Sequence, residues 1–177
     1  MEKKLLLVVD AQKDFVYGAL RNEEAIKRLP NLCNRIRNWK GLILFTQDTH
    51  HENYLETQEG KNLDRIHCIE GTDGWEICDE VKEAYKEVYG DQTLPTILKK
   101  SFGYDGWAEA QLDKLGVTEI EVDGFCTDIC VISQVLVLKA MYPEIKIVVK
   151  EDCCAGLNEK KHQAALEIFN SCQVEVI

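Results

Sequence analysis

The sequence predicts an α/β fold, in which helices cover a mostly parallel sheet. Short, fully apolar runs alternate along the chain with longer segments of helical periodicity, an order typical of parallel sheets. The first run, residues 5–9, is apolar at every position, as expected for a central strand buried on both faces. Neither a repeat nor a linker interrupts the 177 residues, so we expect one domain over residues 1–177.

The first half of the chain contains three predicted strands, at residues 5–9, 42–45 and 96–98. Residues 22–39 repeat apolar side chains on one helical face, and Pro30 among them marks a kink or a second helix start. Gly41 ends this helix. Residues 49–75 are polar and irregular, and so long a loop in a compact domain is more often functional than not. Residues 76–88 favour a second helix.

The second half adds predicted strands at residues 120–122, 145–149 and 174–177, which makes about six strands in the sheet. Residues 106–115 are a predicted short helix that stops at Gly116, and residues 159–169 are a predicted late helix. A largely buried helix begins near Asp128, and either Thr127 or Asp128 can cap it.

Cys130 lies where a thiol can become reactive. The strand at 120–122 runs into Gly124, and the turn after it places Cys130 in the first turn of the following helix. Unpaired N–H groups and partial positive charge at a helix N-terminus favour thiolate over thiol. The alternative is that Cys130, one of eight cysteines, is a small buried hydrophobic residue.

Charged residues follow the ends of the first three predicted strands. Asp10 ends the first strand, Asp48 follows the second, and Lys99 and Lys100 follow the third. The carboxyl ends of parallel strands meet at one edge, where open α/β sheets bind ligands, so these side chains can converge on Cys130. A carboxylate, an ammonium group and a thiol form an acyl-transfer site. Taken singly, the aspartate could cap a helix and either lysine could be a solvated loop cation.

Composition excludes several classes of protein. The formal net charge of −10 argues against nucleic acid as a partner. No apolar run approaches ~20 residues, so we expect no membrane partner, and the short run before Asp10 is a buried strand rather than a signal peptide. We therefore expect a cytoplasmic location with reduced cysteines. No CxxC spacing occurs, which does not support a zinc ribbon or a thioredoxin-type motif.

Three segments resemble the cysteine hydrolases of the isochorismatase-like superfamily: VVDAQKDFV, LKKSF and DGFCTDICV. Within that superfamily the chain is most similar to nicotinamidases. The resemblance implies a single Rossmann-like domain of three layers and a catalytic triad of Asp10, Lys99 and Cys130. Spacing to the aromatic Phe102 selects Lys99, with Lys100 as the alternative. The resemblance also implies hydrolysis of an amide, nicotinamide to nicotinate and ammonia, through a thioester on the cysteine.

In this mechanism Asp10 takes the thiol proton of Cys130 and later passes a proton to the departing ammonia. Backbone N–H groups of Cys126 and Cys130 are the expected oxyanion donors. The resemblance also implies a non-proline cis peptide at Phe125–Cys126.

The resemblance further implies a divalent metal site for Zn, Fe or Mn in the long loop. Asp48, His50 and His67 match its carboxylate and imidazole ligands. Glu59 is the expected fourth ligand, with Glu56 as the alternative. His51 is expected to face solvent, and His162 to be a surface or capping residue. The competing interpretation is a polar loop with incidental histidines.

Phe15 resembles the aromatic residue that packs on the substrate ring, although an ordinary core phenylalanine is equally compatible. The tryptophan that many relatives carry before the HC element is missing, and Trp107 is one candidate to replace it. By resemblance we expect a small amide substrate and a homo-oligomer. Two alternatives stay open: a metal-free hydrolase of another small amide or ureido compound, and a non-catalytic ligand-binding module.

Overall fold

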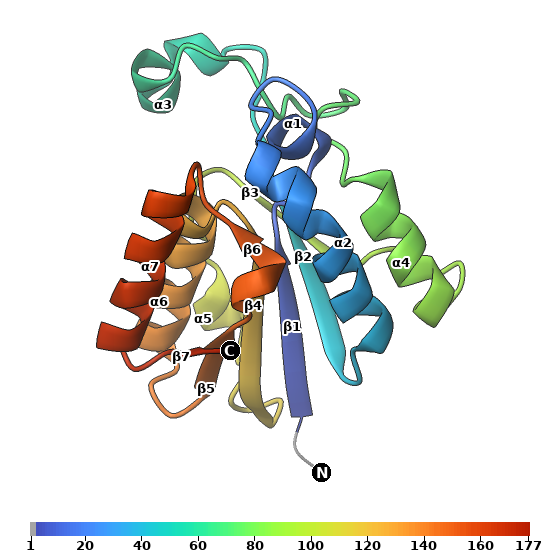
Figure 1. Ribbon diagram of the computed structural model, residues 1–177, viewed down its shortest axis with the longest axis vertical. Helices are drawn as coiled ribbons and strands as arrows, with labels where there is room; N and C mark the ends of the chain where they lie inside the picture. Colours follow the sequence, from blue (N-terminus) through green and yellow to red (C-terminus); the bar gives the residue numbers. More distant parts are fainter. Residues whose placement is uncertain (1–2) are drawn as a thin grey trace.

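The computed structural model describes residues 3–177, which form one α/β fold around a seven-stranded sheet (Figure 1). Every strand pair is parallel, and the order is β3-β2-β1-β4-β5-β7, with β6 pairing to β4. The strands are β1 (Lys3–Val9), β2 (Leu42–Asp48), β3 (Thr96–Lys99), β4 (Val117–Phe125), β5 (Lys146–Val149), β6 (Cys154–Ala155) and β7 (Glu175–Val176). The six predicted strands are confirmed, and the two-residue β6 is an addition.

Helices cover both faces of the sheet and make three layers, as predicted. They are α1 (Lys13–Val16), α2 (Glu23–Asn38), α3 (Gln58–Asn62), α4 (Asp79–Tyr89), α5 (Trp107–Ala110), α6 (Ile132–Met141) and α7 (Glu159–Ser171). Figure 1 shows α2 and α4 on one face and α5, α6 and α7 on the other. None of the helices in the described part of the chain is long and apolar enough to cross a bilayer.

The central strand β1 alternates its side chains between two apolar cores. Leu5 and Leu7 pack in the core beneath α6 and α7, whereas Leu6 and Val8 pack in the core beneath α2 and α4. This alternation follows from the two-residue period of a strand. Burial on both faces explains why the run is apolar throughout.

The parallel register brings four strand ends to one edge of the sheet. Val9 is opposite Thr46 of β2 on one side and Gly124 of β4 on the other, and Asp48 is opposite Lys99 of β3. Gly124 has φ 129°, and a Cβ there would lie 2.1 Å from the carbonyl oxygen of Val9. A residue without a side chain is therefore required where β4 passes β1.

Three local predictions are corrected by the structure. Helix α2 runs unbroken through Pro30, so no second start occurs there. The loop at 49–75 contains a short 3₁₀ turn and α3 rather than irregular chain alone. The helix predicted at 106–115 is the four-residue α5, because Gln111 adopts a left-handed conformation (φ 49°) directly after it.

Candidate active site

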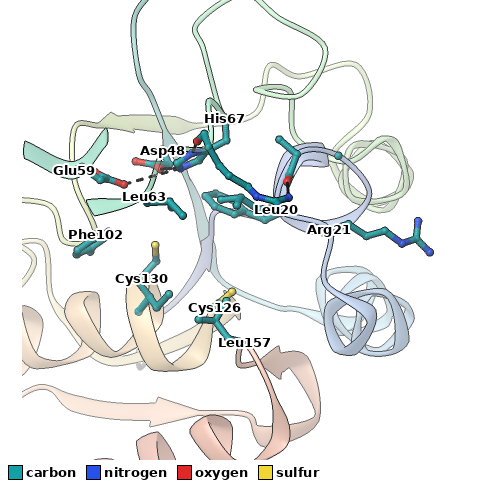
Figure 2. Close-up of a pocket in the computed structure, with 15 residues that line it drawn as sticks. Leu20, Arg21, Asp48, Glu59, Leu63, His67, Phe102, Cys126, Cys130 and Leu157 are labelled. Atoms are coloured by element: carbon teal, nitrogen blue, oxygen red, sulfur yellow. Dashed lines mark hydrogen bonds and ion pairs between the residues drawn. The ribbon is translucent and has the colours of Figure 1, made fainter. Parts of the chain in front are cut away.

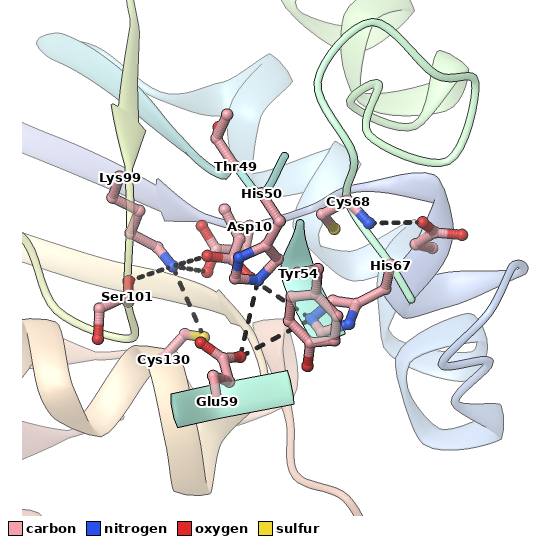
Figure 3. Close-up of polar contacts among 12 residues, drawn as sticks. Asp10, Thr49, His50, Tyr54, Glu59, His67, Cys68, Lys99, Ser101 and Cys130 are labelled. Carbon is pink, nitrogen blue, oxygen red and sulfur yellow. Dashed lines mark hydrogen bonds and ion pairs between the residues drawn. The ribbon is translucent and has the colours of Figure 1, made fainter. Parts of the chain in front are cut away.

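Asp10, Lys99 and Cys130 meet at the carboxyl edge of the sheet (Figure 3). Lys99 Nζ lies 2.7 Å from Asp10 Oδ2 and 3.8 Å from Cys130 Sγ. The three residues are 0%, 2% and 5% exposed. Lys100 is exposed, so Lys99 is the lysine that the structure brings to this group.

Two residues that sequence reasoning missed hold this edge together. The Thr46 hydroxyl donates to Asp10 Oδ1 at 2.6 Å. The Gln12 side-chain amide donates to the carbonyl of Asp48 at 2.9 Å and accepts from its N–H at 2.8 Å, which links the ends of β1 and β2. Both residues are fully buried. For Gln12, the available sequence signal was a glutamine two residues after the aspartate that ends a predicted strand.

The protonation of the three groups follows from burial and from their mutual charges. Burial raises the pKa of Asp10, although the positive charge of Lys99 opposes this. Burial by itself lowers the pKa of Lys99, but the negative charges of Asp10 and Asp48 oppose this effect, and the net pKa is raised. Burial and the charge of Asp10 raise the pKa of the Cys130 thiol well above its ordinary value.

The resting state is therefore a neutral thiol beside an aspartate–lysine ion pair. A helix N-terminus alone favours thiolate, but complete burial dominates here. Cys130 consequently needs a base to remove its proton during attack. The candidate base is the Asp10 carboxylate, because it contacts the same Lys99 ammonium group as Cys130 Sγ.

The turn that carries Cys130 begins at the end of β4. The Phe125–Cys126 peptide is cis, as the resemblance implied. Residues Thr127–Val131 then form one π-helical turn that leads into α6. The carbonyl of Cys126 accepts from the N–H groups of Ile129 and Val131, both at 3.1 Å, and bypasses the N–H of Cys130. The N–H of Cys130 is therefore not engaged by that carbonyl and can donate to an oxyanion.

Neither Thr127 nor Asp128 caps the turn, contrary to the prediction. The Asp128 carboxylate instead accepts from the N–H of Leu157 at 2.9 Å, and the Thr127 hydroxyl lies 2.8 Å from Nδ1 of His162. His162 is 2% exposed, so the prediction of a surface or capping residue was wrong. The α7 cap is Asn158, whose side chain accepts from the N–H of Lys161. The fold buries His162 because α7 packs directly on the turn.

A second group of polar side chains lies beside the first. Asp48, His50, Glu59 and His67 each place one donor atom so that all four atoms lie within 4.8 Å of one another. Glu59 reaches the group from α3, which lies over the carboxyl end of the sheet (Figures 1 and 3). Glu56, the alternative ligand, is exposed and outside the group.

The orientation of the two imidazoles fits a divalent metal ion. His50 Nε2 lies 3.1 Å from Asp48 Oδ2 and 3.6 Å from Glu59 Oε1, yet it has no hydrogen-bond partner among residues 3–177. His67 Nδ1 is 2.8 Å from the carbonyl oxygen of Arg65, which leaves Nε2 directed at the carboxylates. A backbone carbonyl that orients a ligating imidazole in this way is common in metal sites.

The carboxylates of this group are strongly perturbed. Burial opposes ionisation of Asp48, but the adjoining imidazoles of His50 and His67 and the positive charge of Lys99 prevail and lower its pKa. Burial and the negative charge of Asp48 raise the pKa of Glu59. A cation bound between two carboxylates held this close would offset their mutual repulsion. His51 is exposed and pairs loosely with Glu70 at 3.6 Å, so it faces solvent as predicted.

A pocket of about 400 Å³ opens onto both groups. Figure 2 shows the sulfur atoms of Cys126 and Cys130 pointing into it, with Asp48 and His67 across from them. Its apolar lining consists of Phe15, Leu20, Leu63, Phe102, Ile129 and Leu157. The ring of Phe15 meets His67 edge-on at 5.6 Å. Trp107 is fully buried elsewhere and donates to Gln134, so it does not replace the missing tryptophan.

Comparisons with known proteins agree with this architecture. A family model described as "Isochorismatase domain" matches residues 4–177. A nicotinamidase of Schizosaccharomyces pombe is 24% identical over an alignment of 205 positions, which covers 97% of this chain and 91% of that protein. The structure of a nicotinamidase from Bacillus subtilis superposes with a TM-score of 0.85 at 25% identity, covering 98% of each chain. A pyrazinamidase of Pyrococcus horikoshii in complex with zinc gives a TM-score of 0.80 at 24% identity, covering 99% and 98%.

Proposed function

The chain belongs to the isochorismatase domain family, and from this premise we propose that it is a cysteine-dependent amidase that hydrolyses nicotinamide to nicotinate and ammonia. The similar proteins from S. pombe and B. subtilis are described as nicotinamidases, which supports this reaction. The observation that carries the proposal is the buried contact of Lys99 with both Asp10 and Cys130.

The chemistry divides among the three residues. The Asp10 carboxylate removes the proton from Cys130 Sγ as the sulfur attacks the amide carbon, and the neighbouring N–H groups of Cys126 and Cys130 bind the developing oxyanion. Asp10 then donates its proton to the nitrogen as the C–N bond breaks, which releases ammonia and leaves a thioester.

Water completes the cycle. Asp10 accepts a proton from the water that attacks the thioester carbonyl, and the proton returns to Sγ as the C–S bond breaks and the acid leaves. Lys99 remains protonated throughout, and its charge favours the ionised form of the Asp10 carboxyl group against the effect of burial.

Asp48, His50, Glu59 and His67 are the residues that would hold a divalent metal ion, of the type Zn, Fe or Mn. Such an ion supplies a Lewis-acidic point that can bind a ring nitrogen or a water molecule. Phe15 and the apolar lining of the pocket would then contact the faces of a flat heteroaromatic ring. The four-donor group favours this reaction over the metal-free amide or ureido hydrolase.

Incubation of the purified protein with nicotinamide, followed by a coupled ammonia assay, tests the proposal. We expect ammonia release, which a ligand-binding module would not give. A panel of aliphatic amides and ureido compounds in the same assay separates the nicotinamidase from the alternative hydrolase. The homo-oligomer, the lack of nucleic-acid partners and the cytoplasmic location remain predictions, which gel filtration and fractionation can check.

A further inference from the structure

A buried hydrogen bond joins the turn that carries the nucleophile to helix α7. The hydroxyl of Thr127 lies 2.8 Å from Nδ1 of His162, and both residues are almost fully buried. Thr127 follows Cys126 directly and lies three residues before Cys130. It therefore stands between the two residues whose N–H groups face the developing oxyanion in the proposed reaction.

The segment before α7 holds the same turn at one further point and is linked to it through Asn22. The Asp128 carboxylate accepts from the N–H of Leu157 at 2.9 Å. The Asn22 side-chain amide donates to the carbonyl of Gly156 at 2.9 Å and lies 3.7 Å from Cys126 Sγ. A Cβ at Gly156 would lie 2.8 Å from Asp128 Oδ1 and 2.8 Å from the backbone nitrogen of His162, so the segment is packed closely between the turn and α7. Of these contacts, only the one from His162 is made by a titratable imidazole.

We propose that His162 is a positioning residue that, through Thr127, holds the N–H groups of Cys126 and Cys130 in the orientation required for oxyanion binding. The proposal rests on the amidase function proposed above. His162 does not line the pocket that the substrate would occupy, so it acts through the turn and not by contact with the reacting atoms.

The imidazole has to be neutral to fill this role. Burial lowers the pKa of His162, and Nε2 has no hydrogen-bond partner in the part of the chain that the structure describes. The charged groups that face the ring come from α2, the turn, the segment before β6 and α7 itself: Glu24, Arg28, Asp128, Glu151 and Glu159. None of them is within ion-pair distance of the ring, so protonation would place an unpaired charge beside the turn.

Paired substitutions test the contact. Thr127→Val and His162→Phe keep the volume and remove the hydrogen bond, and we expect each to lower kcat roughly tenfold or more with little change in KM. Thr127→Ser and His162→Asn keep a hydrogen-bonding atom in place, and we expect both to recover most of kcat. The acidic limb of the kcat profile should shift in His162→Asn, because the asparagine does not titrate.

Three controls make the result decisive. The Thr127→Val, His162→Phe double variant should be no slower than the slower single variant, since both remove one interaction. Phe169→Leu weakens the packing of the same helix away from the turn, and it should unfold more easily while keeping the wild-type kcat. Wild-type kcat in Thr127→Val, or additive losses in the double variant, would overturn the proposal.

A readout without substrate separates this proposal from the amidase function. The rate at which iodoacetamide alkylates Cys130, followed by peptide mass spectrometry, reports the placement of Sγ beside Asp10 and Lys99. We expect roughly tenfold slower alkylation in Thr127→Val and His162→Phe, because a displaced turn would move Sγ away from Asp10 and Lys99. If the wild-type protein releases no ammonia from any amide, the amidase function fails, and the alkylation series still decides on His162. A rate equal to or above that of the wild type refutes the positioning role.

Discussion

Asp48 and Lys99 are direct partners in the register of β2 and β3, and Lys99 Nζ lies 3.4 Å from Asp48 Oδ1. The same lysine is 2.7 Å from Asp10. One ammonium group thus neutralises a carboxylate of the proposed catalytic triad and a carboxylate of the proposed metal site. The two halves of the site are therefore electrostatically coupled, and a change of charge in either half should alter the pKa values of the other.

Removal of the shared cation is therefore expected to damage both stability and activity. Lys99→Met leaves two buried carboxylates without their partner, and such a loss costs about 3–5 kcal/mol. Urea unfolding should show this decrease, and the ammonia assay should show almost no turnover. Lys100→Met removes the same charge from an exposed neighbour and should change neither property. Equal stability of the two variants would contradict the buried ion pair.

The two cysteines of the pocket should respond differently to truncation. Cys130→Ala removes the nucleophile and should abolish ammonia release. Cys126→Ala keeps the backbone N–H that we assign to the oxyanion and should retain activity close to that of the wild type. The coupled assay on both variants checks this. Comparable activity of Cys130→Ala and Cys126→Ala would show that the sulfur of Cys130 is not the nucleophile.

The metal site gives a matched pair of glutamates. Glu59→Gln replaces a carboxylate of the four-residue group with a neutral, weaker ligand, so metal content and activity should both fall. Glu56→Gln on the exposed face should keep both. Elemental analysis after native purification measures the stoichiometry. Prolonged dialysis against a chelator should lower wild-type activity, and added Zn, Fe or Mn should restore it. Unchanged metal content in Glu59→Gln would exclude this ligand set.

Stability should fall on the acid side because of His162. Its pKa in the folded protein is lowered from 6.5, mainly by burial, so the unfolded chain binds a proton that the folded chain rejects. The contribution of the neutral imidazole is complete above the unfolded pKa and is lost as the pH falls below it. Urea unfolding at pH 7.5 and 5.5 should show a larger decrease for the wild type than for His162→Asn. A parallel decrease in both proteins would assign the acid sensitivity to other groups.

The sheet and the meeting of Asp10, Lys99 and Cys130 follow from features that a sequence displays. Each strand shows as an apolar run that ends abruptly in a polar residue, and parallel connections bring those ends to one edge. Spacing to Phe102 selected Lys99 but left Lys100 open as the alternative. The structure separates them because successive residues of a strand point to opposite sides, and only Lys99 turns inward.

Other features depend on tertiary packing that no local pattern reports. Helix α3 has five residues, too few for a clear period, yet it delivers Glu59 to the metal group. His162 is in a polar stretch of α7 and is buried only because that helix packs on the nucleophile turn. The raised pKa of Cys130 likewise reflects burial and the nearby charge of Asp10, which position at a helix start does not reveal.

The strand that supplies Lys99 is the outermost of the sheet. β3 is four residues long and pairs only with β2, so its backbone is held from one side. Short edge strands open at lower free energy than the strands they flank. Catalytic competence is therefore tied to a ladder at the edge of the sheet. Fraying of β3 would withdraw the ammonium group from both carboxylates and stop the reaction while the central strands stay intact.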